Sequence, residues 1–185
     1  NWIDRGYDVI ALVPSCALML KFEWPLIVPK SRPGYDLVEK LSKRTFDCSQ
    51  YIVDISKKEG IAPGLKPLEG GVALHLACHA RAQNVGPQAA EMLRLIPGMR
   101  EGLNVIERCS GHGGSWGVQK GNFETALKVG RPVATQAAAA HKAHLASECP
   151  LAGKHIRQGM ETVEGAGVVP EALHPIQIVA KAYGL

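Results

Sequence analysis

Long apolar runs are missing from this 185-residue sequence. No stretch approaches the roughly 18 consecutive apolar residues of a membrane-spanning helix, so the sequence predicts no membrane span and leaves open only peripheral membrane association. The first residues, NWIDRGYD, lack the basic and apolar segments of a signal peptide. Because the first residue is not Met and strand-like sequence follows at once, we expect the chain to begin within a fold. We also expect the protein to be cytoplasmic.

Aromatic residues are also scarce, at 5% of the chain, and they do not interleave with the basic residues. The net charge of +4 comes from scattered lysines and arginines. A nucleic-acid interface needs a concentrated basic stripe, so we expect no nucleic-acid partner. The mild basic excess suits a solvated surface, and a docking face for an acidic redox partner is the alternative.

Apolar residues make up 46% of the chain, enough for a substantial core. Apolar runs typical of strands alternate with segments of helical character. This alternation predicts an α/β fold in which parallel-sheet βαβ layers carry helices on both faces. The expected strands are 7–13, 72–77, 103–107 and 143–148. The expected helices are 16–24, 35–44, 48–58, one opened by Pro87 and closed by the Pro-Gly at 97–98, 120–142 with a break near Pro132, one beginning at Pro150, and one ending at Gly184.

Two stretches rich in proline and glycine interrupt this alternation. The segment PLIVPKSRPG, residues 25–34, is expected to be a connector and not a helix. The segment GIAPGLKPLEGG, residues 60–71, is the best candidate for a domain boundary.

Four of the five cysteines follow an apolar run and begin a segment of helical character: Cys16, Cys78, Cys109 and Cys149. In a parallel sheet all strands end at one edge, so such cysteines can converge there. A helix N-terminus favours the thiolate form, which soft metals and iron–sulfur clusters require. The sequence therefore predicts a cluster or metal site, whereas the odd number of cysteines argues against a disulfide framework. Cys48, early in an expected helix, is predicted to serve packing.

Three of the cysteines lie in distinctive motifs: Cys78 in HLACH, Cys109 in RCSGHGGSWG and Cys149 in SECPLAGKHI. These motifs resemble the cysteine-rich CCG domain, in which a single Cys is followed by Cys-Cys-Gly and then by Cys-x-x-Cys. This domain occurs in one subunit each of heterodisulfide reductase and anaerobic glycerol-3-phosphate dehydrogenase, and in the iron–sulfur subunits of glycolate oxidase. The segment LVPSCALML resembles the end of a preceding copy. The resemblance thus implies that residues 1–60 are the C-terminal part of a truncated first CCG-like domain and residues 61–185 a second, with a C-terminal helix.

The motif departs from the family pattern at two positions, where Ser110 and Ala152 replace cysteines. The resemblance then implies Cys78, Cys109 and Cys149 as ligands of a 4Fe-4S or 3Fe-4S cluster, or alternatively of zinc or mononuclear iron. Candidates for the missing ligand are His112, His79 and Cys16. Ser110 is expected either to ligate weakly or to cap the following turn.

The family resemblance implies an iron–sulfur subunit that carries electrons for an oxidoreductase and is not self-sufficient as an enzyme. Its partner would be a flavin dehydrogenase or a ferredoxin-like domain. Two alternatives remain open at this point. The first is a degenerate domain that binds zinc or no metal and serves in assembly; the second is a thiol-redox protein that uses Cys109 or Cys149.

Overall fold

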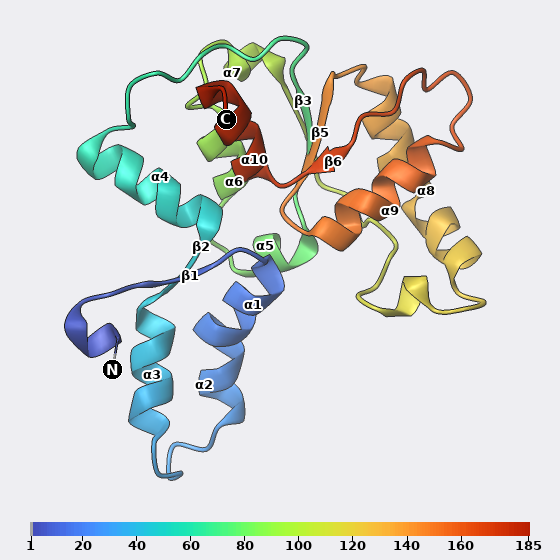
Figure 1. The fold of residues 1–185 in the computed structure, drawn as a ribbon. Coiled ribbons are helices and arrows are strands. Elements are labelled where there is room, and N and C mark those ends of the chain that lie inside the picture. The colour runs from blue at the N-terminus through green and yellow to red at the C-terminus, as the bar shows by residue number, and fades with distance from the viewer. Residues whose placement is uncertain (1) are drawn as a thin grey trace.

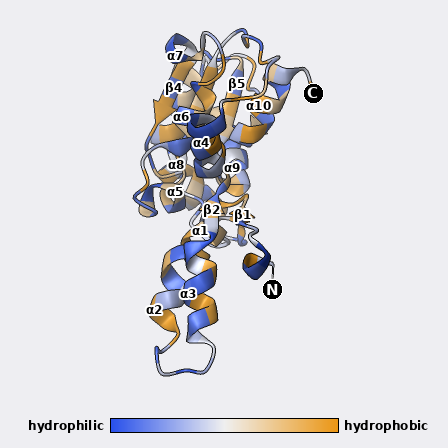
Figure 2. Cartoon of the chain, turned by 90° about the vertical axis from the view of Figure 1, so that its left-hand side faces the viewer, coloured by the Kyte–Doolittle hydropathy of each residue, from blue (hydrophilic) through white to orange (hydrophobic). Residues whose placement is uncertain are grey.

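The computed structural model describes residues 2–185 and contains two separate parallel sheets (Figure 1). The first sheet has two strands, β1 (Val9–Ala11) and β2 (Thr45–Asp47). Between these two strands, three contiguous helical segments follow one another: α1 (Pro14–Leu18), the π-helical turn η2 (Met19–Glu23) and α2 (Trp24–Ile27). A loop then leads to a separate helix, α3 (Tyr35–Lys43). A short 3₁₀ turn, η1 (Ile3–Arg5), precedes β1. Helices α2 and α3 form a hairpin that projects from the rest of the molecule (Figures 1 and 2).

The second sheet has four parallel strands in the order β4-β3-β5-β6. The strands are β3 (Val72–His75), β4 (Leu103–Ile106), β5 (His144–Ser147) and β6 (Ala172–Leu173). Strand β3 is buried along its whole length and pairs with both β4 and β5, so that His75 lies opposite Ile106 on one side and Ser147 on the other. The carboxyl ends of these three strands therefore meet at one edge of the sheet.

Helices cover both faces of the four-stranded sheet. One face packs on α4 (Cys48–Glu59), α6 (Gln88–Leu93) and α10 (Pro175–Tyr183), whose buried side chains share a core with Leu74. The other face packs on α8 (Phe123–Ala139) and α9 (Pro150–Met160), which share a second core with Leu145. Three short helices lie in the connections: α5 (Cys78–Ala82), α7 (Met99–Gly102) and η3 (Trp116–Val118). The α/β fold with helices on both faces is confirmed.

Several predicted element ends are confirmed by specific contacts. Asp47 caps α4 by accepting a hydrogen bond from the Ser49 N–H at 2.9 Å. Pro150 occupies the first turn of α9, and Gly184 ends α10 in a left-handed conformation. Each of these residues has a backbone preference that acts locally, which is why the sequence alone indicated its place.

Other predictions of secondary structure were wrong. The expected break in the long helix does not occur: α8 runs unbroken through Pro132, which is exposed. The start of the PLIVPKSRPG segment is helical, as Pro25 lies in the first turn of α2, where proline is tolerated. Strands β2 and β6 were missed, because runs of three and two residues are too short to show a period.

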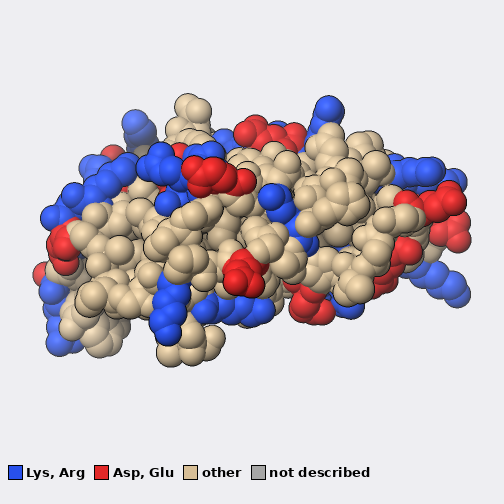
Figure 3. Space-filling model, turned by 90° about the horizontal axis from the view of Figure 1, so that it is seen from above, with Lys and Arg blue, Asp and Glu red and all other residues tan. Residues whose placement is uncertain are grey.

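The surface has no concentration of charge of one sign on the face shown in Figure 3, where basic and acidic side chains are interspersed. Among residues 2–185, no helix combines the length and apolar character needed to cross a bilayer. The two sheets lie on either side of the 60–71 connection, although Val53 of α4 belongs to the core of the four-stranded sheet. The division into domains at residues 60 and 61 stays a prediction.

Candidate cluster site at the carboxyl edge of the sheet

Cys78, Cys109 and Cys149 line one small cavity at the carboxyl edge of the four-stranded sheet. Cys78 is the first residue of α5 after β3, Cys109 lies in the loop after β4, and Cys149 is the N-cap of α9 after β5. The cavity volume is about 10 Å³. The remaining lining residues are His75, Ala77, His79, Arg108, Ser110, His112 and Ala152.

The three thiols differ in exposure and in their nearest polar neighbours. Cys78 and Cys109 are exposed, whereas Cys149 is half-buried. The Gly111 N–H donates to Cys109 Sγ at 3.4 Å. A ring nitrogen of a histidine lies 3.9 Å from each of the other two sulfurs: His79 Nδ1 from Cys78 and His112 Nε2 from Cys149. The site therefore opens to solvent on one side and has imidazoles beside two thiols.

Ser110 and His112 form a buried pair behind the thiols. The Ser110 hydroxyl lies 2.7 Å from His112 Nδ1, so its side chain contacts the imidazole and does not cap a turn as the sequence suggested. Burial lowers the pKa of His112, and the nearby His155 and His79 lower it further. The ring is therefore held in its neutral form, with one nitrogen directed to Ser110 and the other to Cys149.

No helix begins directly at Cys109, in agreement with the long helix expected only from about residue 120. A loop follows Cys109, and α8 begins only at Phe123. Gly111 has a φ of 84°, and a Cβ at this position would clash with the backbone of Ala126 and Gly130. Glycine is required there because the loop turns back tightly against α8. That close approach places the Gly111 amide beside the Cys109 sulfur.

Two cysteines lie outside the cavity. Cys16 is exposed on α1, which packs against α5, and the structure does not bring it into the cavity with the other three. Cys48 is buried at the start of α4, where burial and the neighbouring Asp47 raise the pKa of its thiol. Cys48 thus has the surroundings of a packing residue.

Sequence reasoning assigned no site role to two polar residues beside the motif cysteines. His75 is 2% exposed and hydrogen-bonds Ser147 and the Arg108 carbonyl; burial is the main cause of its lowered pKa. Glu148 is also 2% exposed, and burial with the nearby charge of Asp47 raises the pKa of its carboxyl to about 8. The available signal was their position, His75 at the end of a strand and Glu148 between a strand and a motif cysteine.

Three thiols line the cavity, and thiolates are the ligands that iron–sulfur clusters require. Within residues 2–185, no three His, Cys, Asp or Glu side chains approach closely enough to hold one ion. A cluster presents several iron atoms, so its thiolates need not meet at one point. The cavity itself has room for about one water, and Cys78 and Cys109 are exposed to solvent.

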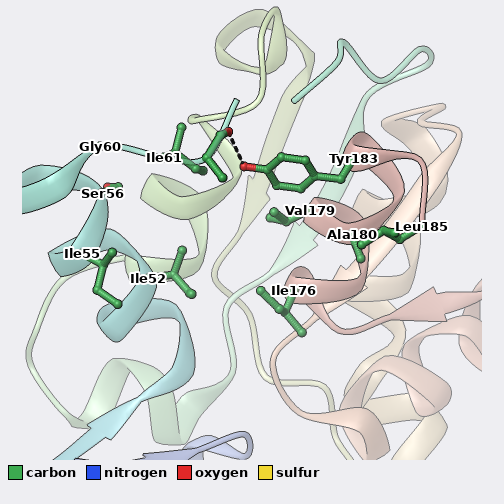
Figure 4. A pocket seen from close by; sticks show the side chains of 11 residues that line it. Ile52, Ile55, Ser56, Gly60, Ile61, Ile176, Val179, Ala180, Tyr183 and Leu185 are labelled. Carbon is green, nitrogen blue, oxygen red and sulfur yellow. Dashed lines mark hydrogen bonds between the residues drawn. The ribbon is translucent and has the colours of Figure 1, made fainter. Parts of the chain in front are cut away.

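A second cavity, between α4 and α10, has a different character (Figure 4). Its volume is about 340 Å³, and no thiol, imidazole or carboxylate lines it. Its two hydroxyls already donate to backbone carbonyls, Ser56 to Val53 at 2.8 Å and Tyr183 to Ala62 at 2.8 Å. Of these two cavities, the one around the cysteines is the one lined by thiols and imidazoles.

Comparison with known proteins agrees with the cysteine motifs. No family model matches the chain. A subunit of the anaerobic glycerol-3-phosphate dehydrogenase of Escherichia coli is 30% identical over 137 residues, which are 71% of this chain and 31% of that protein. A subunit of the fumarate reductase (CoM/CoB) of Methanothermobacter marburgensis is 28% identical over 186 residues, 97% of this chain and 33% of that protein. An uncharacterized iron–sulfur protein of Methanocaldococcus jannaschii is 26% identical over 148 residues, 80% of this chain and 29% of that protein.

The chain spans about a third of the length of these relatives. One of them is named as an iron–sulfur protein, and the other two are named as subunits of a dehydrogenase and of a fumarate reductase. The resemblance inferred from the three cysteine motifs is thereby confirmed. This chain belongs to the cysteine-rich CCG-domain family, with a motif in which Ser110 and Ala152 stand in place of two cysteines.

Proposed function

We propose that this chain is an electron-transfer module of an iron–sulfur oxidoreductase, with the thiolates of Cys78, Cys109 and Cys149 as cluster ligands. The observation that carries the proposal is that these three side chains, from the ends of three strands, line the same cavity. Thiolates are the ligands that iron–sulfur clusters require. The names of the relatives support the class of protein, because they include an iron–sulfur protein and subunits of two reductive or dehydrogenase enzymes.

When bound, the cluster would supply one-electron redox chemistry. The chain's own groups would hold and tune it: the Gly111 N–H donates to Cys109 Sγ, which reduces the negative charge on that sulfur and raises the potential of the centre. His112, next to Cys149, is our candidate for the fourth ligand of a 4Fe-4S cluster, and His79, next to Cys78, is the second candidate. If neither binds iron, the three thiolates suit a 3Fe-4S cluster.

Because the three thiolates are assigned to a cluster, we assign the transformation of any organic substrate to a partner. Two of the relatives are named as subunits. We therefore propose a redox partner, either a flavin dehydrogenase or a ferredoxin-like domain, in the cytoplasm. An exposed site at the rim of the sheet is where such a partner can approach to within electron-transfer distance.

Anaerobic purification followed by iron, sulfide and zinc analysis tests this proposal. We expect brown protein with acid-labile sulfide, and we expect Cys78→Ala, Cys109→Ala and Cys149→Ala each to abolish its visible absorption. Electron paramagnetic resonance of the oxidised and reduced protein then distinguishes a 3Fe-4S from a 4Fe-4S cluster.

Two cysteines provide matched controls, the exposed Cys16 and the buried Cys48, both outside the cavity. Cys16→Ala and Cys48→Ala should leave the absorption unchanged, and loss of the spectrum in either would refute the assignment of ligands. Stoichiometric zinc without sulfide would favour a structural domain. Metal-free protein with one rapidly alkylated thiol would favour a thiol-redox protein.

A further inference from the structure

A hydrogen-bond chain centred on two buried side chains, His75 and Ser147, joins the ends of β3, β4 and β5 beside the three cysteines. At its centre is His75, whose ring lies 2.9 Å from the Arg108 carbonyl oxygen through Nε2 and 3.0 Å from the Ser147 hydroxyl through Nδ1. The Ser147 hydroxyl in turn accepts the Cys149 N–H at 3.4 Å. We infer that His75 is the positioning residue that directs Cys109 and Cys149 into one cavity. The role of this positioning in holding a cluster rests on the proposed function, whereas the hydrogen bonds of His75 do not depend on it.

The donors and acceptors of this chain can be assigned from their chemistry. A carbonyl oxygen only accepts, so His75 Nε2 carries the proton that is donated to Arg108. In the neutral ring Nδ1 then accepts, which requires the Ser147 hydroxyl to donate to it. The Ser147 oxygen retains lone pairs for the Cys149 N–H. One tautomer of the neutral His75 ring, with its proton on Nε2, therefore allows all three hydrogen bonds to form at the same time.

These bonds fix parts of the backbone that the sheet does not hold. Pairing with β3 ends at Ile106 on β4 and at Ser147 on β5. The Arg108 carbonyl belongs to the peptide group that joins Arg108 to Cys109, and this group is planar, so a bond to its oxygen also orients the Cys109 nitrogen. The N–H of Cys149 is held on the other side of the ring. One imidazole thus orients the backbone of both cysteines beyond the last ladder bonds.

Burial makes this arrangement hard to replace. His75 is 2% exposed and Ser147 is 1% exposed, so water has little access to substitute for a lost bond. Removing the imidazole leaves the buried Ser147 hydroxyl without its partner and releases the part-buried Arg108 carbonyl, which favours movement of the loop that carries Cys109. The expected consequence is loss of thiol convergence, beyond any loss of stability.

A dithiol probe tests the inference without any cluster. Phenylarsine oxide joins two neighbouring thiols through its arsenic atom and releases one water, so in metal-free Cys78→Ala protein its capture reports on Cys109 and Cys149. We expect capture of one arsenical per chain in this background, and a rate at least ten-fold lower when His75→Leu is added. Single-thiol alkylation by iodoacetamide should remain within a factor of two or three.

Two conservative variants separate positioning from folding. A glutamine amide nitrogen reaches the place of Nε2, so His75→Gln can keep the bond to Arg108, whereas His75→Asn reaches only the place of Nδ1. We expect His75→Gln to restore most of the capture rate and His75→Asn to restore less, whatever their unfolding midpoints. The inference would be overturned if the capture rates of the three variants simply ranked in the order of their unfolding midpoints. A capture rate in His75→Leu equal to that of the parent protein would also overturn it.

The matched control is His144→Leu, a histidine at the opposite end of β5, where it pairs with Val72. Its capture rate should equal that of the parent protein. Iron and sulfide analysis of the wild-type chain is the separate test of the proposed function. If that analysis finds no cluster while His75→Leu still abolishes capture, the proposed function fails and the positioning role stands. If the wild-type protein contains a cluster, and His75→Leu contains as much cluster and captures the arsenical at the full rate, the proposed function stands and the positioning role fails.

Discussion

At the scale of single residues, Glu148 connects the cysteine site to the first sheet. Its carboxyl oxygen Oε2 accepts the N–H of Ala77, the residue before Cys78, at 3.4 Å. The charge of Asp47, at the end of β2, also acts on this carboxyl group. Burial is the main reason that the pKa of Glu148 rises from 4.5 to about 8. The folded protein therefore carries this side chain as a neutral acid at pH 7.

This burial predicts a pH dependence of stability. Between pH 4.5 and about 8 the unfolded chain releases the Glu148 proton while the folded chain keeps it. The free energy of unfolding should then fall as pH rises through this range, by at most about 1.4 kcal/mol per pH unit, and level off above it. Urea unfolding of metal-free protein at several pH values measures the slope.

Glu148→Gln keeps a neutral side chain of the same shape, so it should remove this contribution and be more stable than wild type at pH 8. The control is Glu101→Gln at an exposed position, which should retain the wild-type slope. An unchanged slope in Glu148→Gln would show that the carboxyl is ionised in the folded protein.

The cysteines and Glu148 also show which properties of single residues could be predicted from the sequence. The positions of Cys78, Cys109 and Cys149 after apolar runs indicated a shared edge, because strand ends are visible in the sequence. The surroundings of each side chain were not visible. Ser110 was expected to act on the backbone or on a metal, but contacts His112, since the loop folds back on itself through Gly111.

At the scale of elements, α10 begins with a capping box built on a histidine. His174 Nδ1 accepts the Ile176 N–H at 3.2 Å, and the Gln177 side chain accepts the His174 N–H at 2.8 Å. Burial lowers the pKa of His174 below 6.5, against the opposing effects of Asp47 and the Leu12 carbonyl. Only the neutral ring has a free lone pair at Nδ1, so the cap requires the unprotonated form.

His174 should therefore stabilise the protein at neutral pH and not in acid. Because its folded-state pKa is lowered, the stability it contributes is present above pH 6.5 and is lost as pH falls through the folded-state value. We expect His174→Ala to cost about 1 kcal/mol at pH 8, the usual value of an N-cap. His174→Asn should keep the cap and lose less stability than wild type on acidification.

Urea unfolding at pH 8 and pH 5.5 provides the measurement. His141→Asn is the control, because His141 is exposed and has a φ of 47°, a conformation that asparagine tolerates. An equal loss on acidification in His174→Asn and wild type would show that His174 does not titrate with folding.

The long helix α8 shows the limit of prediction at this scale. Proline inside a helix predicts a break, because it lacks an N–H and crowds the preceding turn. Packing on α9 overrides this cost: Gly159 of α9 lies against Ala134, and a Cβ there would approach the Ala134 side chain to 2.9 Å. The contact is between residues 25 positions apart, so no local pattern reveals it.

At the scale of the whole molecule, the first sheet is joined to the rest by a small polar network centred on Gln83, at the end of α5. Its amide nitrogen donates to Asp47 Oδ2 at 3.3 Å and its oxygen accepts from Lys21 Nζ at 3.4 Å. Gln83 is 3% exposed. Burial lowers the pKa of Lys21, which Asp47 and Asp54 partly offset. The network thus links η2 and β2 to the helix that carries Cys78.

We expect Gln83→Leu to destabilise the protein by about 1–3 kcal/mol, because it leaves buried polar partners without hydrogen bonds. The loss of stability should be greatest in the part of the chain around β1 and β2. In a Trp116→Phe background the remaining tryptophans, Trp2 and Trp24, report only on that part, whereas circular dichroism reports on all helices. The fluorescence midpoint in urea should shift more than the dichroism midpoint.

Gln136→Leu, on the exposed side of α8, is the matched control and should shift neither midpoint. Equal shifts of both signals in Gln83→Leu would mean that the two sheets unfold as one cooperative unit and that the network is not a specific junction.

The sequence by itself determined the class of fold, four of its strands and most of its longer helices, several helix ends and the three cysteine motifs. These follow from local periodicity, from caps and from the tendency of parallel strands to end at one edge. Tertiary structure alone decided that Cys16 stays outside the cavity, that His75 joins the ends of three strands, that Glu148 is neutral beside Asp47 and that α8 continues through Pro132. Each of these depends on strand register and on packing between residues distant in the chain, which no local pattern encodes.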